Sequence, residues 1–328
     1  MGYPRIWPRI TTVVAFVLLF GSAVVVRAAD EKTEFLRFVD DKSHGGQLQT
    51  AIVDYKNADG VVVHLVAAVH IADQPYYDGL NKTFKKYDAV LYEMVKPRDA
   101  APPQPGEERS TSMISVIQRF MKDTLELKFQ LDQIDYNAPN FVHADLDYET
   151  FEKMEADRGE SIWSLMIQQM IRQMANPPEH QQEIGLPELL AALGSPDRAT
   201  QLKMILGRQF GDIEAQMSGF AGTVLITERN KACFKILDKE IADGKKELGI
   251  FYGAGHMSDM EKRLTDLGFN KTGSHWLVAW NMSADAKPKA DDDAKPAPKK
   301  KVDPEGSNGI IHVQYKSHGT VTHAGGKV

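Results

Sequence analysis

The stretch LGIFYGAGHMSDMEKRLTDLG, residues 248–268, contains the pattern that decides the fold. Leu248–Tyr252 is a short apolar run and predicts a buried strand. Gly253 and Gly255 follow it, and glycine suits a sharp turn or a place where another group approaches the backbone closely. An apolar stripe at helical spacing comes next: Met257, Met260, Leu264 and Leu267. The stretch therefore predicts a strand, a turn that bears His256, and a helix.

A second stretch has the same design. HIAD at residues 70–73 matches HMSD at residues 256–259, because each reads histidine, apolar, small, aspartate, follows an apolar run and opens a helix. In α/β sheets the carboxyl ends of parallel strands face the crevice where ligands bind. We therefore expect His70 and His256 to meet at one point. The alternative is that each ring only caps a turn or bonds a neighbouring loop.

The starts of the two helices carry capping signals. Asp73 is placed to cap the first helix, and Pro75 lies just inside it, where a missing backbone N–H is harmless. Ser258 and Glu261 predict a capping box in the second helix. Both helices are therefore expected to begin directly after their histidine motifs.

Further strands complete an α/β domain. The Asp59-Gly60 pair between β-branched runs predicts a hairpin. Strands are expected at Glu34–Val39, Leu48–Asn57, Val61–His70, Ala89–Val95 and His275–Trp280. Strand, helix and strand in close succession are typical of a βαβ unit. The predicted fold class is α/β, with a mixed sheet core built from two strand–His–helix units and a large helical insertion, about residues 108–222, between them.

The insertion and the segment after it are mostly helical in pattern. Helices are predicted at Ile114–Leu127, Glu149–Arg158, Ser161–Ala175, Leu186–Leu193, Arg198–Phe210 and, ended by Gly244, Thr223–Asp243. One extended piece, NFVHADLD at residues 140–147, lies among them. Its His143 and Asp145 could add ligands, whereas a polar strand edge with Asp147 as a helix cap is the simpler interpretation.

The chain has 328 residues and a net charge of −6. Residues 1–28 have a charged start, an apolar run and small residues at a cleavage position, which predicts a signal peptide, with an uncleaved membrane anchor as the alternative. The domain is expected at residues 29–283, a disordered linker at 284–307 and a tail at 308–328. An acidic mature chain is a poor partner for nucleic acid. We expect a periplasmic or extracellular protein with no stable membrane span after cleavage.

Glu93 is the third candidate site residue, because it lies in the apolar run Ala89–Val95, where an unpaired carboxylate would be costly. Two imidazoles and one carboxylate, from His70, His256 and Glu93, are a common ligand set for a divalent hydrolytic metal. The same trio without metal would serve as a general base and an orienting acid. A purely structural alternative is an ion pair between Glu93 and Arg229.

Other features carry weaker signals. Cys233 is the only cysteine, so the chain has no internal disulfide, and it is expected in the core. The methionines at 166, 170 and 174 predict a core helix or an adaptable apolar wall for a peptide. The histidines at 312, 318 and 323 are more typical of a solvated tail than of a metal site. No sequence signature of a serine hydrolase, a nucleotide enzyme or a cysteine protease is present.

These motifs together resemble the TraB/PrgY/GumN family, which includes the Tiki proteins, over roughly residues 50–280. The family has a Gly-x-x-His, a glutamate ending the next strand, a Glu-Arg-Asn on a long helix and a second Gly-x-x-His. This chain has VVHLVAAVH, then Glu93, then Glu228-Arg229-Asn230, then Gly253-Ala254-Gly255-His256. Ala67 stands where the family usually has the first glycine, and alanine is tolerated there if its backbone dihedrals are ordinary.

The resemblance implies a function. Tiki relatives look like metal-dependent proteases of the cell surface, and the wider clan includes esterase-like and haem-binding members. It implies His70, Glu93 and His256 as metal or acid–base groups, and Arg229 as a group that orients Glu93 or stabilises an oxyanion. We expect an exported hydrolase that attacks a peptide or small ester. The alternative is a non-catalytic envelope protein that binds or sequesters a peptide or a metal-containing ligand.

Overall fold

A computed structural model describes residues 34–41, 45–102, 124–161, 164–165, 168, 186–211 and 222–283. The signal segment, the linker, the C-terminal tail with its histidines and all three methionines of the stripe lie outside these residues. In the part of the chain that the structure describes, none of the helices has both the length and the apolar character that a membrane span requires. The description below concerns the unit that ends before Lys287.

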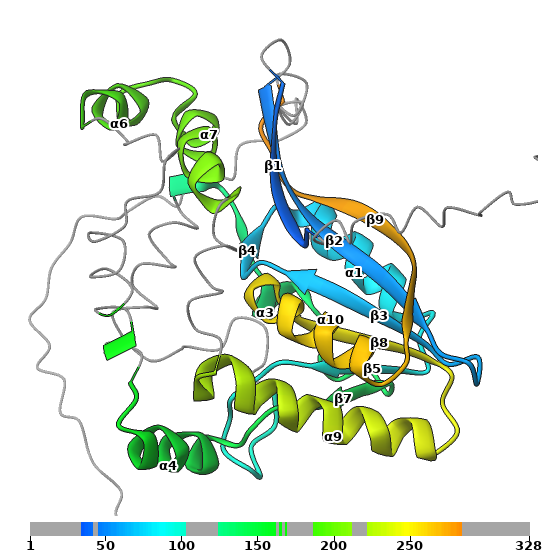
Figure 1. The fold of residues 1–328 in the computed structure, drawn as a ribbon. Helices are drawn as coiled ribbons and strands as arrows, with labels where there is room; N and C mark the ends of the chain where they lie inside the picture. The colour runs from blue at the N-terminus through cyan, green and yellow to red at the C-terminus, as the bar shows by residue number, and fades with distance from the viewer. Residues whose placement is uncertain are drawn as a thin grey trace, which may run out of the picture. The chain divides into compact units, whose positions relative to one another are not determined.

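A mixed sheet forms the centre of the domain (Figure 1). Its seven strands are β1 (Leu36–Asp41), β2 (Gly45–Lys56), β3 (Val62–Ala68), β5 (Ala89–Tyr92), β7 (Phe141–His143), β8 (Glu247–Gly253) and β9 (Asn270–Asn281). The order is β1-β2-β3-β8-β5-β7, and β9 also pairs with β2. The four strands from β3 to β7 run parallel, and the others pair antiparallel. The expected α/β class with a mixed sheet is confirmed.

The predicted hairpin joins β2 to β3. Its turn is closed by Asn57, whose side-chain Oδ1 accepts a hydrogen bond from Val61 N at 2.9 Å. Gly60 has φ 79°, a left-handed conformation that favours glycine. In the antiparallel pairing that follows, Asp54 lies opposite His64. The Asp-Gly signal in the sequence therefore gave the correct turn and register.

The parallel strands are buried on both faces, as a layer between two sets of helices must be. Leu65 and Val66 on β3, and Leu248 and Ile250 on β8, are fully buried. The expected strand–helix–strand unit of β3, α1 (Gln74–Phe84) and β5 is present with parallel strands, and β8 lies between its two strands. The two strands of that unit are separated by a strand that comes more than 150 residues later in the chain.

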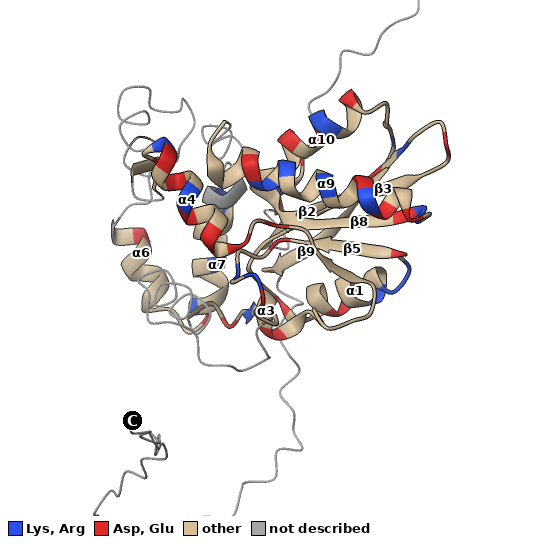
Figure 2. Cartoon of the chain, turned by 90° about the horizontal axis from the view of Figure 1, so that it is seen from below, with Lys and Arg blue, Asp and Glu red and all other residues tan. Residues whose placement is uncertain are grey.

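Helices cover both faces of the sheet. Figure 2 shows α9 (Arg229–Ala242) and α10 (Met257–Asp266) on one face, and α1 (Gln74–Phe84) with the short α3 (Gln130–Gln133) on the other. The charged residues lie mainly on the helices and loops, and the strands between them are almost free of charge. This is the arrangement expected when each helix buries one apolar stripe against a sheet.

The insertion contains more than helices. Its described helices are α4 (Tyr148–Arg158), α6 (Leu186–Leu193) and α7 (Arg198–Gly211). However, β7 joins the main sheet beside β5, and β6 (Lys128–Phe129) pairs with β4 (Ile71–Ala72). The helix predicted to end at Leu127 stops earlier, because Glu126 has φ 57°, a left-handed conformation that interrupts a helix.

Two capping predictions are wrong. Asp73 is the N-cap residue of α1, but its carboxylate accepts hydrogen bonds from Lys203 Nζ at 2.8 Å and Asn281 N at 2.7 Å instead of capping the helix. The N-cap of α10 is His256, so Ser258 lies inside the helix and is not its N-cap residue. The carboxylate of Glu261 accepts a hydrogen bond from the Tyr55 hydroxyl at 2.7 Å.

Candidate functional site

Three neighbouring strand ends bring the candidate residues together. In the order β3-β8-β5, the central strand ends at Gly253 and His256 follows in a short 3-10 turn, Ala254–His256. Glu93 comes directly after β5, and His70 comes shortly after β3. Parallel strands that are adjacent in a sheet end at the same edge. The sequence pattern correctly predicted this shared edge, and the topology adds that His256 is on the middle strand.

Glu93 is fixed by two partners. Its Oε1 accepts a hydrogen bond from Arg229 Nη2 at 2.8 Å, and its Oε2 accepts one from the backbone N–H of Gly253 at 2.7 Å. Burial alone would raise the pKa of Glu93, but the charges of Arg229, His256 and His70 and the hydrogen bond from Gly253 N–H together outweigh burial, so the pKa is lowered. Glu93 is therefore an ionised carboxylate at neutral pH.

Arg229 bridges two carboxylates. Its Nε and Nη2 donate to the two carboxylate oxygens of Asp145 at 3.0 and 2.6 Å, a bidentate contact, while Nη2 also binds Glu93. The Asp145 side chain is fully buried, and that of Arg229 is only 8% exposed. Buried charges need such partners, because an isolated one would be very costly. The predicted ion pair of Glu93 with Arg229 is therefore present, and Asp145 is the member that sequence reasoning did not assign.

The backbone before Arg229 differs from the predicted helix. Residues Val224–Glu228 form a π-helical turn, and α9 begins only at Arg229. π-turns widen a helix locally and are frequent at functional sites. The first two residues of α9, Arg229 and Asn230, both contact groups at the strand ends. The Glu-Arg-Asn motif therefore marks the place where a widened turn meets a regular helix.

His256 is a buried ring, only 4% exposed. Its Nδ1 lies 2.7 Å from Asn230 Oδ1, and its Nε2 lies 3.6 Å from Glu93 Oε1. Burial outweighs the attraction of Glu93 and lowers the pKa of His256 to about 4. The ring is therefore neutral at pH 7 and offers one nitrogen lone pair as a ligand or base.

His70 is exposed, unlike its counterpart in the second motif. It lies close enough for its charge to lower the pKa values of both Glu93 and His256. Among the described residues, its side chain makes no hydrogen bond or ion pair with either of them. Its backbone carbonyl accepts a hydrogen bond from Gln130 N at 2.9 Å, which fixes the turn. The first motif thus presents its ring to solvent near the buried pair.

A metal ion would find two suitable donors here. His256 Nε2 and Glu93 Oε1 are 3.6 Å apart, which is close to the roughly 3.3 Å between two ligands of a tetrahedral ion with bonds of about 2.0–2.1 Å. Each carboxylate oxygen of Glu93 has a further lone pair beyond its hydrogen bond. In the described ranges, however, no three His, Cys, Asp or Glu side chains form a group that could hold a metal. The donor pair fits a divalent ion, and His70 is the nearby candidate for a third ligand.

The backbone at Gly253 and at Ala67 does not need glycine, contrary to what the sequence pattern suggested. Gly253 has φ −54° and ψ 143°, which any residue can adopt, so a sharp turn does not explain it. A Cβ built there would lie 3.4 Å from Glu93 Oε2, in ordinary contact. Ala67, where the family motif has glycine, is fully buried and has no positive φ. Neither position requires glycine for its backbone conformation.

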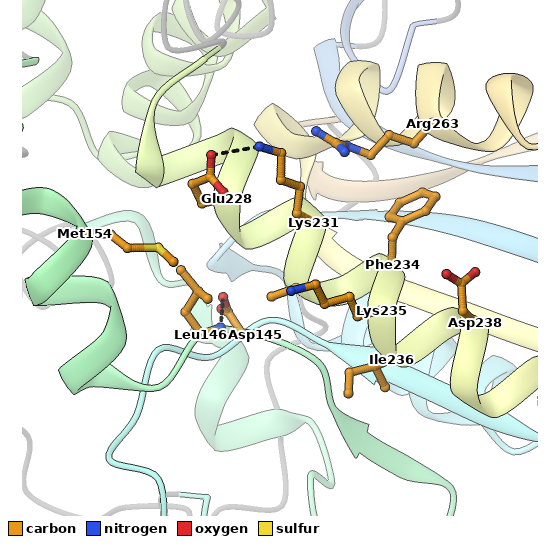
Figure 3. A pocket seen from close by; sticks show the side chains of 11 residues that line it. Asp145, Leu146, Met154, Glu228, Lys231, Phe234, Lys235, Ile236, Asp238 and Arg263 are labelled. Atoms are coloured by element: carbon orange, nitrogen blue, oxygen red, sulfur yellow. Dashed lines mark hydrogen bonds and ion pairs between the residues drawn. The ribbon is translucent and has the colours of Figure 1, made fainter. Parts of the chain in front are cut away.

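A hollow of about 450 Å³ lies beside the site, on the far side of Asp145. Figure 3 shows Lys231 reaching towards Glu228, with Met154 on one side and Phe234 and Arg263 on the other. Lys231 Nζ donates to Glu228 Oε1 at 3.0 Å. The hollow therefore has a mixed lining of charged and apolar side chains, and its wall includes Asp145, the partner of Arg229.

The remaining candidates have structural roles. Asp147 caps α4 by accepting from Thr150 N at 2.9 Å, as predicted. His143 Nε2 lies 2.6 Å from the carbonyl oxygen of Met94, so it does not point to the site as a ligand. Cys233 is fully buried in the core, and burial raises the pKa of its thiol, which agrees with the predicted packing role.

The chain matches no protein-family model, and neither the curated proteins nor the solved structures include a match to it. The geometry of the strand ends is therefore the basis for any functional conclusion.

Proposed function

We propose that the chain is a hydrolase whose reacting water binds between His70, Glu93 and His256, at the carboxyl edge of β3, β8 and β5. The observation that carries the proposal is the pair formed by the neutral ring of His256 and the ionised Glu93, 3.6 Å apart beside an exposed histidine. A neutral imidazole next to a fixed carboxylate can accept a proton from water in a single step. A peptide or small ester is the proposed substrate.

The reaction follows from the positions of these groups. His256 Nε2 takes a proton from the water while the water oxygen forms a bond to the carbonyl carbon. The imidazolium that results is stabilised by the neighbouring carboxylate of Glu93. When the tetrahedral intermediate collapses, the leaving amine or alkoxide takes the proton back from His256. Arg229 already donates to Glu93 and Asp145, which favours an orienting role for it over that of an oxyanion ligand.

As the alternative to this metal-free step, we propose a divalent metal as cofactor, with His256 and Glu93 as donors and His70 as the candidate third ligand. Nε2 of His256 would then be a metal ligand and not the base. When bound, such an ion would lower the pKa of water and polarise a carbonyl group. We further propose an exported, periplasmic or extracellular protein, anchored to the membrane if its N-terminal segment is retained. Its acidic charge disfavours nucleic acid as a partner.

The test is hydrolysis of a fluorogenic peptide library and of small chromogenic esters, with and without added Zn²⁺, Mn²⁺ or EDTA. We expect His256→Ala to lower kcat by at least about 100-fold, the usual contribution of a positioned acid–base group. His275→Ala is the matched control, because His275 is an exposed histidine on β9. Turnover that is equal in the two variants would refute the assignment.

A second candidate function is non-catalytic binding of a peptide or metal-containing ligand. The observation in its favour is that both oxygens of Glu93 already accept hydrogen bonds. Calorimetric titration with the same metals and peptides distinguishes the two functions. Tight binding without turnover in any metal would favour this candidate over the hydrolase.

A further inference from the structure

Behind His256, the side chains of Asn230, Asp259 and Arg263 form a hydrogen-bonded relay that ends at the hollow. Asn230 Oδ1 contacts His256 Nδ1, Asn230 Nδ2 donates to Asp259 Oδ2 at 2.7 Å, and Arg263 Nε donates to the same Asp259 oxygen at 2.6 Å. We propose that Asn230 is a positioning residue that decides which nitrogen of His256 carries the proton, and that Asp259 and Arg263 hold Asn230 in the orientation this requires. The consequence for catalysis rests on the proposed function.

The direction of each hydrogen bond in this relay follows from Arg263, because its side chain cannot accept a hydrogen bond. Arg263 can only donate, so Asp259 is held as an acceptor. A carboxylate acceptor must face the amide NH₂ of Asn230, and the same NH₂ donates to the carbonyl oxygen of His256 at 3.2 Å. The amide oxygen of Asn230 is then the atom that faces the imidazole.

The tautomer of His256 is thereby determined. An amide oxygen accepts only, so Nδ1 must carry the proton of the neutral ring, and Nε2 keeps the lone pair. Nε2 is the nitrogen on the side of Glu93. If Asn230 turned over, its NH₂ would face Nδ1, the proton would move to Nε2, and the site would have neither a base nor a ligand there.

The aspartate of the first motif shows that this device is specific to the second motif. Asp73 occupies the place that corresponds to Asp259, yet it pairs with Lys203 and with a backbone N–H of β9. It therefore ties α7 and β9 to the first turn and does not orient a side chain for His70. Only the buried histidine has its tautomer held by a relay among the described residues.

The test reads the tautomer directly, by NMR correlation of the imidazole nitrogens and protons in full-length, ¹⁵N-histidine-labelled protein treated with EDTA. We expect wild type to show His256 protonated at Nδ1 alone. Asn230→Ala should introduce the Nε2–H form, while Asn230→Asp, which keeps an acceptor, should preserve the wild-type tautomer. A wild-type ring protonated at Nε2, or an Ala variant that keeps the wild-type pattern, would overturn the inference.

Asn230 is fully buried, so a variant closer to the surface provides a second test that does not depend on its folding. Asp259→Ala removes the acceptor, allows Asn230 to turn over and should also introduce the Nε2–H form. Asp266→Ala is the matched control, because Asp266 accepts from Lys262 four residues earlier on the same helix but contacts no part of the relay. Equal spectra for the two variants would refute the role of Asp259.

Kinetics then connect the relay to function. If the chain is a hydrolase, Asp259→Ala should lower kcat by about 10- to 100-fold with little change in KM, as is common when the partner that orients a ligand or base is lost. If no form of the protein hydrolyses any substrate, the proposed function is refuted. The tautomer inference is then judged by the NMR result alone. A normal kcat in a variant with the wrong tautomer would refute the link to catalysis.

Discussion

The two ends of the parallel strands each contain a histidine beside a carboxylate, and the charge of the ring differs between them. At the carboxyl end, burial makes His256 a neutral ring whose pKa is lowered to about 4. At the amino end, both ring nitrogens of His64 contact carboxylates, Asp54 Oδ1 at 2.6 Å and Glu247 Oε1 at 2.7 Å. Both nitrogens can donate only if the ring is protonated. Burial lowers the pKa of His64, but these hydrogen bonds outweigh it and the net pKa is raised.

The difference shows that hydrogen-bond partners, and not burial alone, decide the charge of a histidine. At the carboxyl end, Arg229 already supplies the positive charge that compensates the carboxylate of Glu93. At the amino end, the imidazolium of His64 supplies that charge itself, between two strands and stacked on Tyr87 at 4.4 Å. One end therefore retains a neutral imidazole, and the other is a structural ion cluster. The predictions below test this division.

The largest expected effect is at the carboxyl end. Asp145→Ala removes a fully buried carboxylate from Arg229, and breaking a buried pair from one side costs about 3–5 kcal/mol. The free energy of unfolding from urea titration should fall by that amount. Asp266→Ala, which removes an exposed i,i+4 partner of Lys262, should cost less than about 0.5 kcal/mol. Similar losses in the two variants would mean that the Arg229 cluster is not a buried network.

The two glycines of β8 give the next largest contrast. A Cβ at Gly249 would lie 2.6 and 2.8 Å from ring atoms of Tyr87, the ring that stacks on His64. Gly249→Ala should therefore destabilise the fold by about 1–3 kcal/mol, the usual cost of overpacking. Gly253 has ordinary dihedrals, and an added Cβ would meet Glu93 Oε2 at an ordinary contact distance. The effect of Gly253→Ala should therefore stay within about 0.5 kcal/mol. Thermal unfolding of both variants would show whether the amino end is the tighter one.

Ala67→Gly introduces the glycine found at this place in the TraB/PrgY/GumN motif that the sequence resembles, and it should bring no benefit. The residue is fully buried in β3 and its backbone needs no glycine. Loss of a buried methyl and the greater freedom of glycine should lower stability by about 1 kcal/mol. Activity per folded molecule should be unchanged. A gain in activity would show that the first turn has to move during the reaction.

The smallest effect is a gradual dependence of stability on pH at the amino end, because Glu247 is 43% exposed and solvent screens its charge. The pKa of His64 in the folded chain lies above its ordinary value of 6.5. The stability that His64 contributes to the folded chain is therefore complete below pH 6.5 and is lost as the pH rises through the pKa of His64 in the folded state. Asp54 has a lowered pKa, chiefly through its bond to His64, so its contribution is lost in acid.

Urea titrations of wild type and His64→Gln across pH 5–10 test this sign. Wild type should lose stability on the alkaline side, and the variant should have a flatter profile there. The other groups at this cluster are the Tyr87 phenol and His275, which acts on Asp54 through its charge. His275→Gln is therefore the control, and an unchanged alkaline slope in His64→Gln would assign the effect elsewhere.

Much of this arrangement could be predicted from local sequence patterns. Apolar runs predicted the strands, Asp59-Gly60 predicted the hairpin, and the rule for parallel strands placed Glu93 and His256 at one edge. Strand order could not be predicted, because the sequence of a fully buried strand does not indicate which strands lie beside it. The place of β8 between β3 and β5 was therefore missed. The N-cap residue of α10 was assigned wrongly, because Ser258 and Glu261 fit the sequence pattern of a capping box, whereas the N-cap is His256.

The two His-x-x-Asp motifs show where local pattern stops being informative. Asp73 and Asp259 have the same place in the motif, yet one binds Lys203 and the other Asn230. Those partners come from α7 and α9, and packing alone determines which helix lies next to each turn. Asn230 and Asp145 were present in the quoted motifs, but only the fold reveals that they contact the site.

The central place of β8 has a consequence for how the protein is made. A growing polypeptide that has left the ribosome or a translocation channel only as far as β7 contains β3 and β5. It does not yet contain β8, the strand that lies between them in the sheet. It also lacks β9, whose pairing partner β2 was made more than 200 residues earlier. Such distant pairings fold late and slowly. The proposed catalytic groups therefore come together only when synthesis of the domain is nearly complete, which would keep an unfinished hydrolase silent.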